Sequence, residues 1–151
     1  MLRCMTTYSV VVALHIIAVL AAYGLPLAAP LVVPYVRRNH PEALPGLHAA
    51  QHFVNNAITG PFTLLLLAFG LYLAYDGDRW GDPFVGIGIG AVVIIAVVGG
   101  GVVVPAVKAL MGLDPGSAEY DRVYRRYLRA ESFLGVVVLL TVFAMAAKPF
   151  S

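Results

Sequence analysis

Four long apolar stretches, each free of Asp, Glu, Lys and Arg, alternate with short polar segments along the chain. The uncharged stretches cover residues 7–36, 49–75, 83–107 and 132–147. A hydrocarbon layer about 30 Å thick requires about 20 helical residues, which the first three stretches supply. The fourth is long enough when its helix begins a turn earlier, near Leu128. Each stretch therefore predicts one membrane span.

The apolar residues are continuous rather than alternating, which indicates helices and not the strands of a membrane barrel. The predicted fold is all-α: a polytopic transmembrane four-helix bundle that forms a single domain over residues 1–151. Its spans are expected at about residues 7–36, 49–75, 83–107 and 128–147.

Composition supports a membrane location, because 60% of the 151 residues are hydrophobic and only 12% are charged, outside the usual range of soluble domains. Four spans use nearly the whole chain, so no soluble domain remains to carry an active site, and we expect a non-enzymatic protein.

The one cysteine, Cys4, excludes an internal disulfide and a multi-cysteine metal cluster. Residues 1–23 resemble a secretory signal, but the apolar run continues about ten residues further, which favours a span.

The distribution of Lys and Arg predicts the orientation of the bundle. Seven of the ten basic residues lie in the segments that follow the first and third spans. Arg3, Arg79 and Lys148 lie on the other side. Basic loops stay in the cytoplasm, so we expect a bacterial cytoplasmic membrane protein with both termini outside. The turn "DGDRWGDP", Asp76 to Pro83, is predicted to be a polar hairpin outside, because its spacing differs from that of a calcium loop.

The third span is rich in glycine. Gly86 and Gly90 have the spacing at which small residues let membrane helices approach closely. A second group, Gly99 to Gly101, precedes Pro105. We expect these glycine faces to serve packing within the bundle or the formation of a homo-oligomer.

A basic, tyrosine-rich segment precedes the fourth span. Asp114 followed by Pro115 is typical of a helix start. We expect a short interfacial helix at the inner headgroup level, with anionic inner-leaflet lipid as its partner and no role for nucleic acid. The basic residues of this helix are Arg122, Arg125, Arg126 and Arg129.

Glu131 follows these arginines and has two interpretations. It lies within two helical turns of Arg125, Arg126 and Arg129, so a salt bridge at the interface is one expectation. The other is a carboxylate that faces the bundle and accepts a proton, because ionisable groups at membrane depth usually serve a function.

Polar residues gather at the start of the second span. Most of them recur at intervals of three or four residues, so they share one face of a helix. Contact with lipid would be costly, and the face is therefore expected to turn toward the bundle or a water-filled pocket open to the cytoplasm. The residues of this polar stripe are His48, Gln51, His52, Asn55, Asn56 and Thr59.

Two functions of the polar stripe are open. Its side chains can hydrogen-bond to neighbouring helices, and to the carbonyl groups that Pro26, Pro30 and Pro34 release in the first span, at about 0.6 kcal/mol each. Alternatively, they line an inward cavity for an ion, a proton or a small ligand. Two histidines four residues apart are too few for a zinc or copper site, so no metal is expected.

His15 in the first span is the alternative candidate for a binding residue. Counted from the middle of each span, His15 lies about 7 Å toward the outer side and His52 about 16 Å toward the inner side, which excludes one haem between them. Met145 in the fourth span lies about 9 Å outward. Histidine and methionine are a known pair of haem iron ligands. A histidine bonded to a backbone carbonyl, with Met145 as packing, is the simpler alternative.

The hydrophobic motifs also resemble a known family. The stretches "ALHIIAVLAAYGLPLAAPLVVPYV", "GPFTLLLLAFGLYLA", "WGDPFV" and "VVLLTVFAMAAKPF" resemble the bacterial four-span family called domain of unknown function 2269. More remotely, Leu14-His15 and Lys148-Pro149 are similar to copper-resistance D and haem-synthesis J type membrane proteins. That similarity implies a haem b or porphyrin held by His15. The residues after His15 differ from the tryptophan and arginine of the J-type family, so the resemblance extends to the scaffold and not to the oxidase activity.

Overall fold

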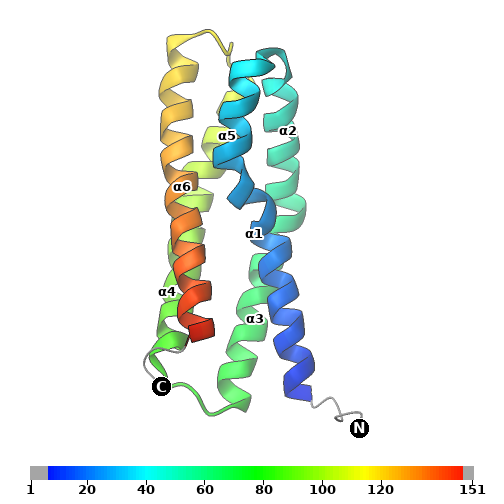
Figure 1. The fold of residues 1–151 in the computed structure, drawn as a ribbon, viewed down its shortest axis with the longest axis vertical. Helices are drawn as coiled ribbons and strands as arrows, with labels where there is room; N and C mark the ends of the chain where they lie inside the picture. Colours follow the sequence, from blue (N-terminus) through cyan, green and yellow to red (C-terminus); the bar gives the residue numbers. More distant parts are fainter. Residues whose placement is uncertain (1–6, 148–151) are drawn as a thin grey trace.

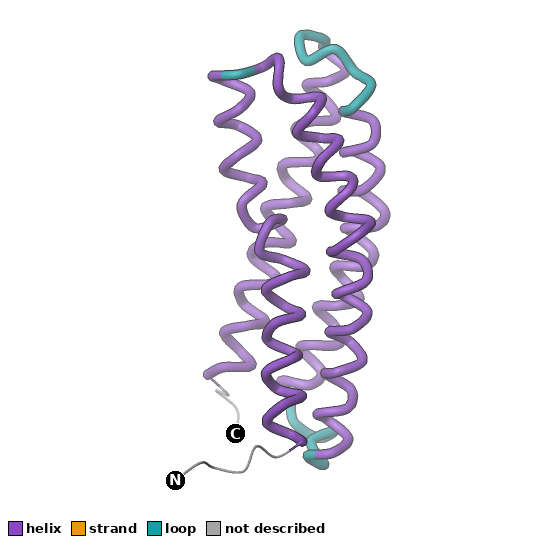
Figure 2. Tube along the Cα trace, turned by 90° about the vertical axis from the view of Figure 1, so that its right-hand side faces the viewer, coloured by secondary structure: helices purple, strands orange, loops and turns teal. Residues whose placement is uncertain are grey.

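The computed structural model of the chain describes residues 7–147, which form an antiparallel bundle of four helical rods (Figure 1). No strand occurs within residues 7–147, and only short loops join the rods (Figure 2). All four rods are long and apolar enough to cross a membrane, so the predicted all-α four-helix fold of a multi-pass membrane protein is confirmed. Arg3, Cys4 and Lys148-Pro149, used in the sequence predictions, lie outside the described residues.

Two of the four rods are divided by a short π-helical turn. The first rod is α1 (Thr7–Asn39), followed by the 3-10 turn η1 (Pro41–Ala43). The second consists of α2 (Leu44–Val54), the π-helical turn η2 (Asn55–Thr59) and α3 (Gly60–Asp76). The third consists of α4 (Pro83–Val98), the π-helical turn η3 (Gly99–Val103) and α5 (Val104–Leu110), and the fourth is α6 (Ala118–Ala147).

Proline explains both π-helical turns. Each turn ends two residues before a proline, Pro61 after η2 and Pro105 after η3. A proline has no N–H to donate to the carbonyl four residues earlier, and the backbone ahead of it adopts the wider π pattern. In η2, the N–H of Gly60 accordingly bonds to the carbonyl of Asn55, five residues earlier.

The two ends of the bundle differ in charge. Helix α1 begins and α6 ends at one end, beside the connection from α3 to α4 (Figure 1); we call this the hairpin end. The opposite end, where α1 ends and α6 begins, carries Arg37 and the arginines of α6, and we call it the basic end.

At the basic end the observed helices extend further than the predicted spans. At the connection from α3 to α4 the observed limits, Asp76 and Pro83, match the predicted ones to within one residue. At the basic end α1 continues to Asn39 instead of residue 36, and α6 already begins at Ala118 instead of residue 128. Charged residues mark where the apolar stretch ends, but they do not end a helix.

The basic segment is the first part of α6 and not a separate interfacial helix. After Pro115 no proline interrupts it, and arginine is a good helix former, so the helix continues directly into the span. Ser117 caps this helix in place of the expected Asp114. Its Oγ accepts a hydrogen bond from the backbone N–H of Tyr120 at 3.1 Å and donates one to the carbonyl of Asp114 at 2.8 Å.

Buried side chains form two groups inside the bundle. The larger group lies toward the basic end and includes Tyr120, Tyr124 and Tyr127. The smaller group lies toward the hairpin end, around Ala22 and Leu66. Large apolar side chains are exposed along the outside of every rod, as expected for a surface in contact with lipid.

The connection from α3 to α4 is a short polar hairpin, as predicted. The backbone of Asp78 is left-handed, with φ at 48°, and the N–H of Arg79 donates to the carbonyl of Ala74 at 2.9 Å. Arg79 also pairs with Asp82, with 3.6 Å between Nη1 and Oδ2.

Candidate functional site

His48, the first residue of the polar stripe, is completely buried at the basic end. Its Nε2 lies 2.9 Å from the hydroxyl of Tyr120, and its Nδ1 lies 2.9 Å from Oε1 of Gln51. Gln51 in turn donates from Nε2 to the hydroxyl of Tyr127 at 2.9 Å. Two residues of α2 are thus joined to two tyrosines of α6 by a continuous chain of hydrogen bonds.

The amide of Gln51 fixes the direction of these hydrogen bonds. Its Oε1 is an acceptor, so Nδ1 of His48 is the donor. In the neutral ring the other nitrogen is then an acceptor, and Tyr120 donates its hydroxyl hydrogen to Nε2. Both ring nitrogens of His48 are satisfied in this way, and the residue links α2 to α6.

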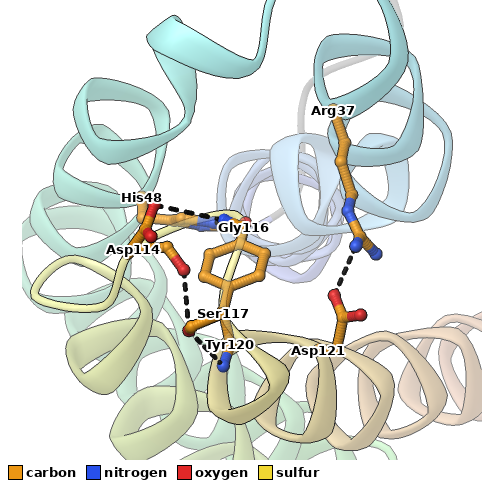
Figure 3. Close-up of polar contacts among 7 residues, drawn as sticks. All are labelled: Arg37, His48, Asp114, Gly116, Ser117, Tyr120 and Asp121. Atoms are coloured by element: carbon orange, nitrogen blue, oxygen red, sulfur yellow. Dashed lines mark hydrogen bonds and ion pairs between the residues drawn. The ribbon is translucent and has the colours of Figure 1, made fainter.

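Arg37, near the end of α1, completes this cluster. Its guanidinium forms an ion pair with Asp121 and lies over the rings of Tyr124 and Tyr120, 4.5 and 5.7 Å from their centroids. The two rings are stacked, with their centroids 6.0 Å apart and their planes at 12°. Figure 3 shows Arg37 and His48 reaching the start of α6 from two different helices. The cluster ties α1, α2 and α6 together.

Thr59, the last residue of the polar stripe, bonds to the first span. Its hydroxyl donates to the carbonyl of Ala22 at 3.1 Å, which is the carbonyl that Pro26 leaves without its helical partner. Next to it, Thr63 donates to the carbonyl of Thr59 at 2.7 Å, and Tyr23 donates to the hydroxyl of Thr63 at 3.1 Å. The polar residues here hold two helices together.

The remaining members of the stripe have fewer partners. Nδ2 of the exposed Asn56 lies 3.2 Å from Nε2 of His52, and Nδ1 of His52 is buried without a hydrogen-bond partner in residues 7–147. Asn55 is half-buried at the start of η2. An inward cavity for an ion or a small ligand stays a prediction for this part of the stripe. In the same residues, no three His, Cys, Asp or Glu side chains come together as a metal site requires.

An open groove of about 500 Å³ lies on the outer side of α6, beside η3. Four guanidinium groups surround it, and its apolar wall comes from both elements. We call it the arginine groove. Its lining residues are Val102, Arg122, Arg125, Arg126, Arg129, Ala130 and Phe133.

The four arginines share this groove because of their spacing. Intervals of three and four residues place them within an arc of about 100° on α6. The buried Tyr120, Tyr124 and Tyr127 occupy the face that turns toward the bundle. The same helix therefore carries a packed aromatic face and an exposed cationic face.

No carboxylate neutralises the arginine groove within residues 7–147. The ion pairs there are Arg37–Asp121, His40–Glu42 and Arg79–Asp82, and none involves a groove arginine. Nor does any of the four donate a hydrogen bond to another described side chain or carbonyl. The groove thus holds four exposed positive charges that are available to an anion from outside the chain.

Glu131 lies on the bundle-facing side of α6, where it is 7% exposed. It forms no ion pair with another described residue, so the interfacial salt bridge with Arg125, Arg126 or Arg129 is absent. The reason is geometric. Glu131 lies seven residues after Tyr124 and four after Tyr127, so it shares their face of α6, whereas the arginines lie on the opposite face. Whether this carboxylate accepts a proton stays a prediction.

His15 and Met145 pack against different helices. The imidazole of His15 lies beside Gly70 of α3, where a Cβ would meet its Cε1 at 3.3 Å. The methyl group of Met145 packs on the buried Gly88 of α4. Nδ1 of His15 is buried and has no hydrogen-bond partner in the described chain. Their joint role as haem ligands stays a prediction.

Sequence reasoning identified the tyrosine face and the arginines, but it missed the role of Arg37 and Asp121. These two residues are 84 positions apart, and in the sequence each belongs to an ordinary polar segment. Their pairing follows from the antiparallel arrangement of α1 and α6 and from the continuation of both helices at the basic end.

No family model, curated protein or solved structure matches the chain, so its resemblance to other four-span families stays an expectation.

Proposed function

We propose that the protein is a non-enzymatic, multi-pass protein of the bacterial cytoplasmic membrane that binds the phosphate-bearing headgroup of anionic lipid in its arginine groove. The observation that carries this proposal is the set of four exposed arginines around one groove, without a carboxylate partner in the described chain. Guanidinium groups bind phosphate oxygens through paired, charge-assisted hydrogen bonds.

The length of the helices supports a position of the groove at the membrane surface. Helix α1 has 33 residues and is about 50 Å long, whereas the hydrocarbon layer is about 30 Å thick. In α6 all the charged residues lie within residues 118–131, at the basic end, so we expect the part of the bundle that extends beyond the hydrocarbon layer to be there. Basic segments stay in the cytoplasm, so we place this end at the inner leaflet and both termini outside.

The polar stripe has a supporting role in this proposal. His48 and Gln51 bond to Tyr120 and Tyr127, and these contacts fix the part of α6 that precedes the span. Thr59 bonds to α1. A rigid helix holds its arginines at constant distances from one another, which favours the binding of a small rigid group such as phosphate.

The proposal is tested by melting the purified protein in nanodiscs of phosphatidylcholine with and without phosphatidylglycerol. A ligand that binds the folded state at 100 times its Kd stabilises it by about 2.7 kcal/mol, so we expect a higher Tm with the anionic lipid. Arg126→Gln combined with Arg129→Gln should reduce this increase and keep the wild-type Tm in phosphatidylcholine alone.

The matched control is Arg38→Gln combined with Lys108→Gln. Both residues are exposed, and neither lines the groove, so the control removes the same charge from another part of the surface. It should retain the response to phosphatidylglycerol. If the control and the groove variant lose the response equally, general surface charge explains the effect and the groove has no role.

A second candidate function is the binding of a haem or porphyrin by His15, favoured by the buried and unpartnered Nδ1 of that residue. A bound haem would supply one-electron redox chemistry. The test is the absorption spectrum of the purified protein, in which a Soret band should be present and should disappear in His15→Ala. A colourless preparation from haem-supplemented cells would refute this candidate.

A further inference from the structure

The arginine groove is built for more than one phosphate. All four arginines line the groove. By their order along α6 they divide into two pairs, Arg122 with Arg125 and Arg126 with Arg129, and the second pair lies four residues, or about 6 Å, further along the helix axis. One phosphate group accepts hydrogen bonds from one or two guanidinium groups. A ligand with a single phosphate therefore leaves one of the two pairs unoccupied.

The charges lead to the same conclusion. Like charges three and four residues apart on a helix repel one another, and the described chain supplies no carboxylate to the groove arginines. A phosphodiester carries one negative charge, so it offsets one of four positive charges. Two phosphodiester groups offset two of the four charges, one at each pair.

The groove also continues into an apolar face that suits acyl chains. Phe133 lines the groove and is 50% exposed. Further along α6 toward the hairpin end, Val136 and Leu140 are 54% and 62% exposed. Intervals of three and four residues place all three on the face of α6 that carries the arginines. A headgroup held by the arginines would thus have its acyl chains along this exposed face.

We propose that the ligand of the arginine groove is a lipid whose headgroup contains two phosphodiester groups joined by a short linker, with one phosphate at each arginine pair. This inference rests on the proposed function of the groove and names its ligand class. The linker distinguishes such a lipid from two separate anionic lipids, because binding of the first phosphate raises the effective concentration of the second.

The experiment compares cardiolipin, which has two linked phosphodiester groups, with phosphatidylglycerol at equal total phosphate, in nanodiscs that contain the wild-type protein. We expect the apparent affinity for cardiolipin to be at least tenfold higher. Soluble pyrophosphate and inorganic phosphate form the third arm. They should compete with cardiolipin only weakly, because they lack acyl chains.

Two double variants test whether the groove arginines cause the preference for cardiolipin over phosphatidylglycerol. Arg126→Gln with Arg129→Gln removes one pair, so its affinity for cardiolipin should fall to about that for phosphatidylglycerol, while the control Arg38→Gln with Lys108→Gln keeps the tenfold ratio. The wild-type comparison requires no variant, and it decides the inference even if the double substitution impairs folding.

The outcomes are distinct. Equal affinity of the wild type for both lipids at equal phosphate would overturn the two-phosphate inference and leave the proposed lipid-binding function intact. A response to neither lipid would refute both. Pyrophosphate that displaces cardiolipin at similar concentration would show that the ligand is a soluble diphosphate, which also overturns the inference.

Discussion

The hydroxyl of Thr59 in the second span donates a hydrogen bond to the carbonyl of Ala22 in the first span, and Pro26 is the reason that this carbonyl is available. Proline cannot donate to the carbonyl four residues before it, and in lipid an unpaired carbonyl is costly. Thr59 lies in the π-helical turn that precedes Pro61. The irregular parts of two spans therefore satisfy each other.

Replacement of Thr59 by valine should destabilise the protein. The side chain keeps its shape but loses the donor, and interhelical hydrogen bonds in membranes contribute about 0.6 to 1.7 kcal/mol. The measurement is the free energy of unfolding in mixed detergent micelles. Thr141→Val is the matched control, because Thr141 donates to Val137 in its own helix. A cost for Thr59→Val no larger than for the control would contradict the role assigned here.

The hydrogen bond between His48 and Tyr120 should show strong coupling in a double-mutant cycle. Each single change, His48→Leu or Tyr120→Phe, leaves a buried polar partner unsatisfied, at a cost of about 1 to 3 kcal/mol. The double variant should cost clearly less than the sum of the two. His40→Leu with Tyr120→Phe is the control pair, since His40 is exposed. Additive costs in the His48 cycle would mean that the two residues act independently.

The sequence was sufficient to predict the number of spans and the limits of the α3–α4 connection at the hairpin end. There the loops are short and polar, and Pro83 begins a helix at the point where the charged residues stop. At the basic end the same method failed by up to ten residues. Helices continue there because Tyr120 and Arg37 give their outer turns a packed interior, which a count of charged residues does not detect.

The candidate site was predicted in its composition but not in its connections. The sequence predicted a basic, tyrosine-rich helix, and in the structure its tyrosines are buried while its four arginines line an exposed groove. The position of Glu131 was left open between interface and bundle, because it closely follows the arginines in the sequence. On the helix it shares the buried face of Tyr124 and Tyr127. The partners of His48 and Gln51 come from α6, more than 70 residues away, and one sequence contains no signal for such contacts.

Glu131→Gln should stabilise the protein at alkaline pH, at which the carboxylate is charged. The carboxylate of Glu131 is buried and has no ion pair with another described residue, and an uncompensated charge away from water is unfavourable. Glutamine has nearly the same shape without the charge, so we expect the free energy of unfolding to rise by about 1 kcal/mol. Glu119→Gln, at an exposed position, should change it by less. A loss of stability in Glu131→Gln would indicate that the charged carboxylate has a favourable partner in the assembled protein.

The predicted glycine face of Gly86 and Gly90 can be tested as an interface by substitution at Gly90. Gly88 is buried against Met145, whereas Gly86 and Gly90 are exposed, and a Cβ at either would meet no other atom within 4 Å. Gly90→Ile should therefore leave the fold of the single chain unchanged, and if these exposed glycines form a homo-oligomer it should shift the protein toward monomer by blocking close approach. The measurement is the mass of the protein in detergent by light scattering, with Ile89→Leu as a control on the adjacent exposed position. An oligomer that persists unchanged in Gly90→Ile would exclude this face as its interface.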